Sequence, residues 1–326
     1  MDISRTGAAG GSETRLSFHG DGGTLFGIHI INLLLSIFTL GIYYFWGKVR
    51  VQRFLHSQMA FDGDRFAYHG TGVELLLGFL KTLGLVALGV IGLVLLQLFG
   101  ARPETVAVAT LLIYLVLLVV VPVAIAGSRR YRLSRASWRG IRFSFRGQTG
   151  AFVRMFVSGA LLSVVTFGLY YPFFFNNMWR FLIGNTYYGT QRFEFDGTGA
   201  DLFGKFLLAI VLTPLTLGLY WFWFAAHRQR YMWARTSFAA ARFRCTVTGG
   251  RLFRLNLGNG LLLVITLGLA LPWVQARNIR FLCGTLAVEG LLEMDAIRQE
   301  AQVASPTGEA IADFLGLDFP GLAPGW

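Results

Sequence analysis

Apolar residues in this chain fall into long blocks that are separated by shorter polar and aromatic connections. Six blocks lie near residues 24–46, 73–99, 105–127, 151–175, 202–225 and 252–276. Each block contains 23 to 27 residues, enough for an α-helix to cross a hydrocarbon core of about 30 Å. The pattern predicts an all-α membrane protein with about six transmembrane helices.

The connections between blocks carry a different pattern, in which apolar and polar residues alternate before a glycine. Clear examples are Phe66-x-Tyr68-x-Gly70 and Phe193-x-Phe195-x-Gly197. A period of two that ends at a glycine is typical of a strand followed by a turn. We therefore expect short interfacial β-hairpins between the helices, with irregular aromatic loops in the headgroup region as the alternative.

Two phrases recur along the chain and define a repeated unit of about fifty residues. The phrase Thr39-Leu40-Gly41 returns at residues 166–168, 216–218 and 266–268, and an arginine followed by an aromatic residue comes fourteen positions after each threonine. A fifth Arg-aromatic pair stands at Arg130-Tyr131. The chain therefore reads as five units, the second of which carries about 27 extra residues, the length of one added membrane helix.

The repeated phrases supply the candidate functional residues. The glycines lie well inside the apolar blocks and are candidates for helix kinks: Gly41, Gly168, Gly218 and Gly268. The arginines of the Arg-aromatic pairs, together with a lysine inside the second block, are candidates for binding a lipid or another anionic ligand: Arg53, Arg130, Arg180, Arg230, Arg280 and Lys81. Anchoring at the membrane interface is the simpler role for these cations.

The blocks and their flanks divide the chain into a polar N-terminal segment (1–23), a repeat-built transmembrane domain (24–288) and an acidic C-terminal tail (289–326). If every block crosses once, the cations sort to 19 on one side and nine on the other, and both termini lie outside the cytoplasm. We favour this arrangement. In the alternative, each unit is a helical hairpin bent at Thr-Leu-Gly, and only Arg102 lies outside.

Composition limits the chemistry that this chain is expected to perform. The net charge is +12, and because the cations flank apolar blocks, anionic lipid headgroups are the expected partners rather than nucleic acid. Neither metal-ligand spacing nor a nucleotide-binding or catalytic motif is present. We predict no metal, no cofactor and no enzymatic activity, and association into a homo-oligomer stays open.

The combination of Thr-Leu-Gly-x-Tyr, Arg-aromatic and Phe-x-Phe-x-Gly-Thr-Gly resembles the YjgN-like family over residues 16–290. This resemblance implies a multi-pass protein of the bacterial inner membrane and supplies no activity or catalytic residues. Two functions remain open. One is a transporter or channel for a small anionic or lipidic solute, with a polar cavity near Gly168 and Gly218. The other is a non-transporting protein that organises lipid or a protein partner.

Overall fold

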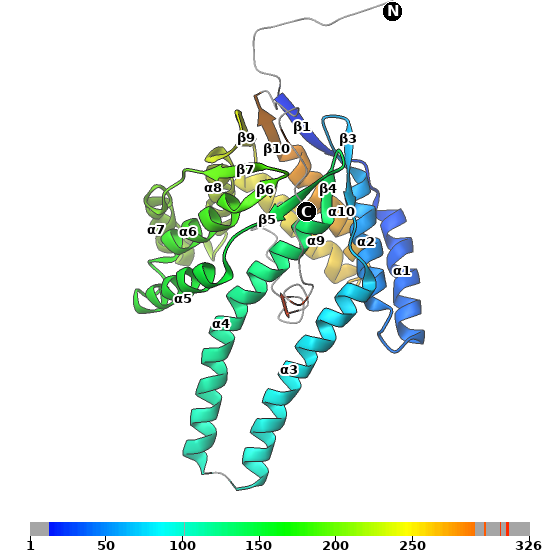
Figure 1. Ribbon diagram of the computed structural model, residues 1–326. Coiled ribbons are helices and arrows are strands. Elements are labelled where there is room, and N and C mark those ends of the chain that lie inside the picture. Colours follow the sequence, from blue (N-terminus) through cyan, green and yellow to red (C-terminus); the bar gives the residue numbers. More distant parts are fainter. Residues whose placement is uncertain (1–12, 101, 291–296, 298–306, 308–310, 313–326) are drawn as a thin grey trace, which may run out of the picture.

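One order of elements, strand–helix–helix–strand, occurs five times in the computed structural model, which describes residues 13–100, 102–290, 297, 307, 311 and 312 (Figure 1). The strands are β1 (Glu13–Phe18), β2 (Met59–Phe61), β3 (Asp64–Tyr68), β4 (Ala136–Trp138), β5 (Ile141–Phe145), β6 (Thr186–Tyr188), β7 (Gln191–Phe195), β8 (Thr236–Phe238), β9 (Ala241–Cys245) and β10 (Leu286–Glu289). The helices are α1 (Gly22–Phe38), α2 (Tyr44–Gln58), α3 (Gly72–Leu98), α4 (Pro103–Arg135), α5 (Thr149–Val165), α6 (Tyr171–Gly184), α7 (Gly199–Thr216), α8 (Trp221–Ala234), α9 (Gly249–Ile265) and α10 (Leu271–Thr285).

The ten strands form a closed antiparallel barrel in which each strand pairs with its neighbours along the chain and β1 pairs with β10. Two-residue turns join the units. In the turn between β2 and β3, Asp62 and Gly63 have φ angles of 51° and 81°. Positive φ at both central residues matches the twist of the flanking strands. Strands thus form where the alternating pattern predicted them, but they join into a single barrel.

The prediction of an all-α fold with about six crossings was therefore wrong. Four of the six apolar blocks are not continuous helices, because the Thr-Leu-Gly phrase reverses the chain within each of them and creates a helical hairpin. Each of Gly41, Gly168, Gly218 and Gly268 lies in such a reversal instead of a kink. Among the described residues, α3, α4 and α7 are long and apolar enough to cross a membrane.

The threonine of the phrase ties the two helices of a short hairpin together. The Thr216 hydroxyl donates to the Leu212 carbonyl at 2.7 Å and accepts from the Tyr220 amide at 3.3 Å. The same two bonds occur at the three other phrases. Between them, residues 217 and 218 both adopt the left-handed conformation, with φ of 49° and 82°. The phrase is therefore a helix C-terminus, a tight reversal and a new helix N-terminus in five residues.

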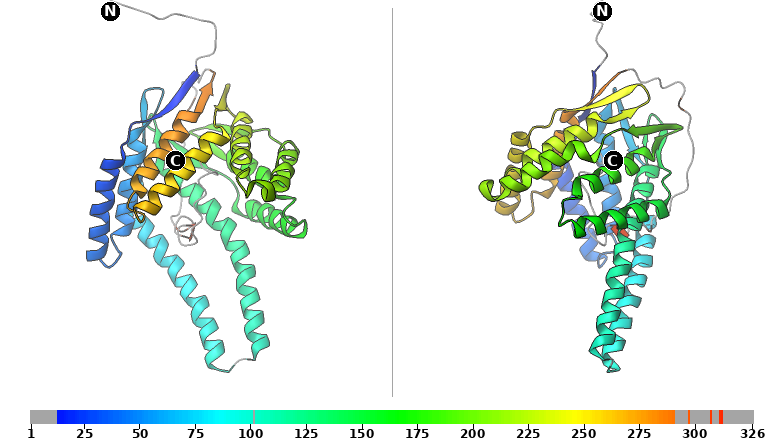
Figure 2. Two further views of the ribbon diagram at one scale, coloured as in Figure 1. Left: turned by 180° about the vertical axis from the view of Figure 1, so that it is seen from behind. Right: turned by 90° about the vertical axis from the view of Figure 1, so that its left-hand side faces the viewer.

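The helix pairs surround one end of the barrel and extend away from it (Figures 1 and 2). The helices contact one another in chain order, and α10 packs against α1, so the helical layer closes in the same way as the barrel. The hairpin of α3 and α4 extends well beyond the four short hairpins in every ribbon view (Figure 2). All strand connections lie at the barrel end, and the helix reversals lie away from it.

Consecutive units pack closely where a glycine begins the first helix of a unit. A Cβ atom at Gly249 would lie 2.8 Å from the Trp223 Cα, and one at Gly199 would lie 2.6 Å from the Phe173 Cα. Gly22 and Gly72 meet tryptophan rings in the same way. Because backbone atoms cannot move aside as a flexible side chain can, glycine is required at these contacts.

Candidate functional site

The arginines of the Arg-aromatic pairs connect each unit to the next one. Arg180 Nη2 donates to the Gly197 carbonyl at 2.6 Å, and Arg53 and Arg130 make the same contact with Gly70 and Gly147. Arg280 closes the ring by donating to the Gly20 carbonyl at 2.7 Å. These four candidate residues therefore hold the turn at which the following unit enters its first helix. A contact with lipid stays a prediction for them.

The aromatic member of the pair contacts the turn of its own unit. The Tyr231 hydroxyl donates to Asp201 Oδ2 at 2.5 Å and lies 3.0 Å from the Thr198 carbonyl. At the equivalent position in the second unit, the Tyr131 hydroxyl donates to Glu74 at 2.9 Å, and Arg135 pairs with the same carboxylate. Since each pair connects two successive turns, the Arg-aromatic phrase is well suited to fixing the order of units around the barrel.

The remaining predicted site residues lie apart from this connection. Lys81 is exposed on α3, nine residues after the helix begins. Arg230 precedes Tyr231 on α8. The four turn glycines have open space where a Cβ would stand, and the residue before each of them is apolar and between 92% and 97% exposed: Leu40, Phe167, Leu217 and Leu267. The structure does not bring the predicted residues together into one pocket.

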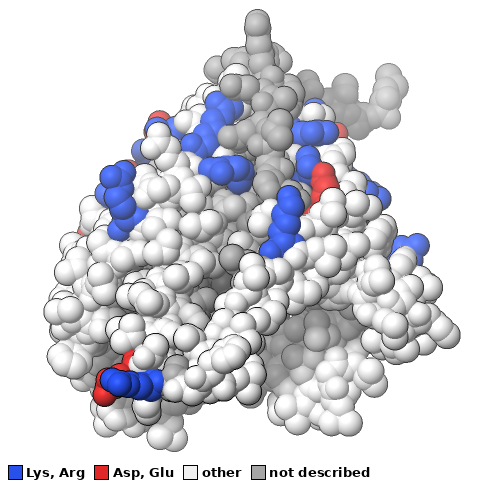
Figure 3. All heavy atoms as spheres, turned by 60° about the horizontal axis from the view of Figure 1, so that its bottom comes forward, with Lys and Arg blue, Asp and Glu red and all other residues white. Residues whose placement is uncertain are grey.

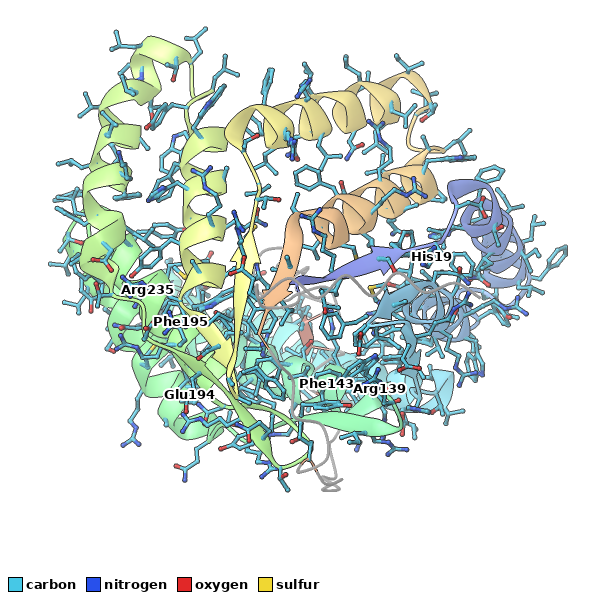
Figure 4. The ribbon with its side chains drawn as sticks, turned by 90° about the horizontal axis from the view of Figure 1, so that it is seen from above. His19, Arg139, Phe143, Glu194, Phe195 and Arg235 are labelled. Carbon is cyan, nitrogen blue, oxygen red and sulfur yellow. The ribbon has the colours of Figure 1, made fainter. Side chains whose placement is uncertain are left out.

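Inward-facing side chains of the barrel form two tiers of five, at positions that are equivalent in the five units. One tier contains Phe61, Trp138, Tyr188, Phe238 and Val288, and the other contains Leu16, Phe66, Phe143, Phe193 and Phe243. Neighbouring rings are close together: the Phe193 and Phe238 centroids are 4.5 Å apart, and those of Phe61 and Trp138 are 5.2 Å apart. The barrel thus has a predominantly aromatic interior, which Figure 4 views from above with Phe143 labelled.

A cavity of about 100 Å³ lies within the barrel. All ten residues of the two tiers line it, and below them lie residues of the helix ends, including Leu133, Ile183 and Trp233. Its one charged lining residue is Arg129 on α4, whose Nη2 donates to the Thr186 hydroxyl at 3.3 Å. The sequence did not single out Arg129, because it lies next to Arg130 of the recurring pair. Comparison of equivalent positions would have found it, since the other units have Gln52, Trp179, Gln229 and Ile279 there.

The outer face of the barrel carries a ring of exposed arginines, also at equivalent positions. These are Arg15, Arg65, Arg142, Arg192 and Arg242, each directly before an inward-facing apolar residue. Alternation along a strand explains the arrangement, because successive side chains point to opposite faces. On the face drawn in Figure 3, most Lys and Arg residues lie toward the barrel, and most of the hairpin surface is uncharged.

The described residues include no group of three or more His, Cys, Asp or Glu side chains that could hold a metal ion. Burial lowers the pKa of His56, at the base of the barrel, to about 4, so this imidazole is neutral at physiological pH. Burial raises the pKa of the Cys283 thiol to about 11, and the pKa of Cys245 is also raised by burial. Neither thiol is therefore activated as a nucleophile.

Comparison with known proteins places this architecture in a family. The model of a family described as "Bacterial protein of unknown function (DUF898)" matches residues 13–222 and 206–314. The chain belongs to the DUF898 family. No solved structure matches the chain. The two matches of the family model overlap and together cover nearly all of the five strand–helix–helix–strand units.

Two curated relatives of this DUF898 member are called inner membrane protein YjgN. The protein from Escherichia coli K12 is 36% identical over 128 residues, which are 39% of this chain and 30% of the relative. The protein from Salmonella typhimurium is 28% identical over 157 residues, 48% of this chain and 38% of the relative. The aligned part thus spans about a third of these relatives. The YjgN-like resemblance is confirmed, and the chain is a multi-pass protein of the bacterial inner membrane.

Proposed function

We propose that this protein organises membrane lipid without transporting a solute, by inserting four short hairpins halfway into one leaflet while the hairpin of α3 and α4 crosses the bilayer. The barrel then lies at the membrane surface. The observation that carries the proposal is the length of the uncharged stretch on each helix leg. No catalytic step is part of this role.

In the long hairpin, each leg has an uncharged stretch long enough to cross alone. Residues 82–101 of the α3 leg and 105–128 of the α4 leg, 20 and 24 residues, contain no Asp, Glu, Lys or Arg. At 1.5 Å per residue these stretches are about 30 and 36 Å long, which matches a hydrocarbon core of about 30 Å.

In a short hairpin, one uncharged stretch of similar length is shared between two legs. Residues 22–47, 155–179, 206–227 and 255–276 lack Asp, Glu, Lys and Arg and contain 26, 25, 22 and 22 residues. Each leg therefore has roughly 11 uncharged residues and reaches about 16 Å, half of the hydrocarbon core. This limit includes α7, in which Lys205 precedes the apolar part.

The tips of the short hairpins have the chemistry expected of a reversal that ends inside lipid. The exposed residue at each tip is Leu or Phe, as at Leu217 and Phe167. In water a tight turn normally carries Asn, Asp or Gly, and a large apolar side chain would gain nothing there. The turn closes its own hydrogen bonds through the threonine hydroxyl, so few backbone groups face the lipid unsatisfied.

A transport pathway has less support. A polar cavity was expected near Gly168 and Gly218, but no atom lies within 4 Å of a Cβ built at either glycine. The cavity within the barrel is almost wholly apolar and has buried residues such as Leu133 and Ile183 at its base. A conducting route for an anion needs polar or cationic lining groups along its length.

The distribution of cations indicates which side of the membrane the barrel occupies. Of the 29 Lys and Arg residues, Arg102 is the only one within residues 82–128, between the barrel-side ends of the long hairpin. Short cytoplasmic connections are rich in Lys and Arg. The barrel and its arginine ring therefore face the cytoplasm in this proposal, and anionic headgroups of the inner leaflet are the expected partners.

Reconstitution separates the two roles. Purified protein is incorporated into unilamellar liposomes of phosphatidylethanolamine and phosphatidylglycerol (3:1), and vesicle diameter and uptake of radiolabelled phosphate are both measured. Insertion into one leaflet predicts smaller vesicles as the protein-to-lipid ratio rises, without phosphate uptake above that of empty liposomes. The matched variant replaces Leu40, Phe167, Leu217 and Leu267 with serine and should lose most of the size effect. Phosphate uptake that depends on the protein, with unchanged vesicle size, would contradict the proposal.

A further inference from the structure

The cavity inside the barrel has a lining that is specific to one side of an otherwise regular ring of aromatic residues. Eight of the ten tier positions are Phe, Trp or Tyr, and the two exceptions, Leu16 and Val288, belong to the paired strands β1 and β10. At the four equivalent positions in the other units, each tier has an aromatic ring. The smaller side chains at this seam leave unfilled volume beside the rings.

The cavity also contains one cationic group. Arg129 is half-buried, lines the cavity from the α4 side and is held by its hydrogen bond to Thr186 on β6. The equivalent residues in the other four units are uncharged. A guanidinium in a low-dielectric site favours an anionic partner, and its planar donors match a carboxylate.

From these two features we propose that the barrel binds a medium-chain carboxylate, with the carboxylate at Arg129 and the hydrocarbon chain between the two tiers. The volume of about 100 Å³ sets the size of the ligand. At 10–15 Å³ of such volume for each water-sized group, the cavity holds on the order of eight groups, and a methylene is roughly the size of a water molecule. A saturated chain of about eight carbons therefore fits, whereas a sixteen-carbon chain does not.

The position of Arg129 also orients the ligand. The residue lies on α4 before the strand β4 begins, so the carboxylate is at the base of the barrel, next to the helix ends. The chain then runs along the strands between rings such as Phe193 and Phe238. Burial of the chain supplies apolar contact, at about 0.8 kcal/mol per methylene before the cost of ordering it, and the charge selects the head group.

The test uses the full chain in phosphatidylcholine nanodiscs and equilibrium dialysis of radiolabelled octanoate, with octanol, palmitate and empty nanodiscs as comparisons. We expect saturable binding of one octanoate per chain, with octanol and palmitate at least tenfold weaker. Arg129→Gln should weaken octanoate binding at least tenfold and leave octanol binding unchanged. Glutamine is the native residue at the equivalent positions 52 and 229, so this variant is expected to fold.

Two further variants locate the site. Val288→Phe places an aromatic ring at the seam, as in the other four units, and should abolish octanoate binding. Arg65→Gln changes an exposed arginine of the outer ring and should leave binding unchanged. Absence of saturable octanoate binding by the wild-type chain would overturn the proposal. Equal affinities for octanoate and octanol, in the wild type and in Arg129→Gln alike, would overturn the assignment of the head group to Arg129.

Discussion

The long hairpin and the four short hairpins are built from uncharged stretches of nearly equal length, but they divide them differently. In the long hairpin each of the two legs has its own stretch of 20 or 24 residues, whereas in a short hairpin one stretch of 22 to 26 residues serves both legs. Hydropathy averaged along the chain cannot distinguish the two arrangements. The difference lies in the reversal, which is Thr-Leu-Gly or Thr-Phe-Gly in the short hairpins and residues 99–102 in the long one.

The largest expected difference between the two kinds of hairpin concerns a charge at the tip. Leu217→Arg places a guanidinium near the bilayer centre and should cost about 2.5–3.5 kcal/mol, whereas Phe99→Arg lies at the far membrane surface and should cost about 0–1 kcal/mol. Chemical unfolding in bicelles measures both free energies. Similar small costs for the two variants would show that the short hairpins reach the surface.

The base of the barrel distinguishes the first unit from the unit with the long hairpin, because His56 stands where the latter has Leu133. His56 has its pKa lowered from 6.5 to about 4, so above pH 6.5 it is neutral in both the folded and the unfolded chain. Below pH 6.5 the unfolded chain binds the proton first, and folding stability falls until about pH 4, by up to ~3 kcal/mol. His56→Leu should remove this loss in unfolding titrations between pH 7 and pH 4. An unchanged pH dependence in His56→Leu would show that His56 does not cause it.

A third comparison concerns the contact between units. Gly249→Ala forces a Cβ against the Trp223 backbone and should destabilise the fold by about 1–3 kcal/mol. Its neighbour Gly250 has open space at the same helix start, so Gly250→Ala is a matched control that should be neutral or stabilising by up to about 1 kcal/mol. At the α4–α5 contact next to the long hairpin, Thr149 replaces this glycine and Val123 replaces the aromatic residue. If both alanine variants proved equally stable, the close contact between units would be wrong.

The smallest expected effect concerns the reversal itself. Thr216→Val removes a hydroxyl that bridges two helices and should cost about 1–2 kcal/mol, because the Tyr220 amide loses its acceptor. Thr110→Val in the long hairpin removes only a bond to the Val106 carbonyl and should cost less than about 0.5 kcal/mol. Thermal unfolding in the same detergent compares the two variants. Equal shifts in Tm would show that the hydroxyl has no special role at the turn.

The sequence predicted local structure better than its connections. The Phe-x-Phe-x-Gly pattern located β3 and β7, because period two and a terminal glycine are local signals. Closure of the barrel depends on β1 meeting β10, which are separated by nearly the whole chain, and no local pattern reports such a pairing. The Thr-Leu-Gly phrase was interpreted as a kink because its left-handed leucine or phenylalanine is rare for a large apolar residue.

The candidate site was predicted only in part, for a related reason. Repetition identified the Arg-aromatic pairs, and the structure shows that four of the arginines bind glycine carbonyls of the next unit. Repetition also hid Arg129, because that residue departs from the pattern that defines the units. Positions that differ among the units are therefore better candidates for ligand binding than positions they share.

The side of the membrane on which each connection lies tests the central claim most directly. In a background with Cys245 and Cys283 replaced by serine, single cysteines at Arg102, Thr190 and Ala240 are treated with a membrane-impermeant maleimide in intact and permeabilised spheroplasts. The hairpin architecture predicts that the cysteine at 102 reacts in intact spheroplasts and that those at 190 and 240 both react only after permeabilisation. Labelling of 190 and 240 from opposite sides would contradict the account, because it requires the intervening α7–α8 segment to cross the membrane once.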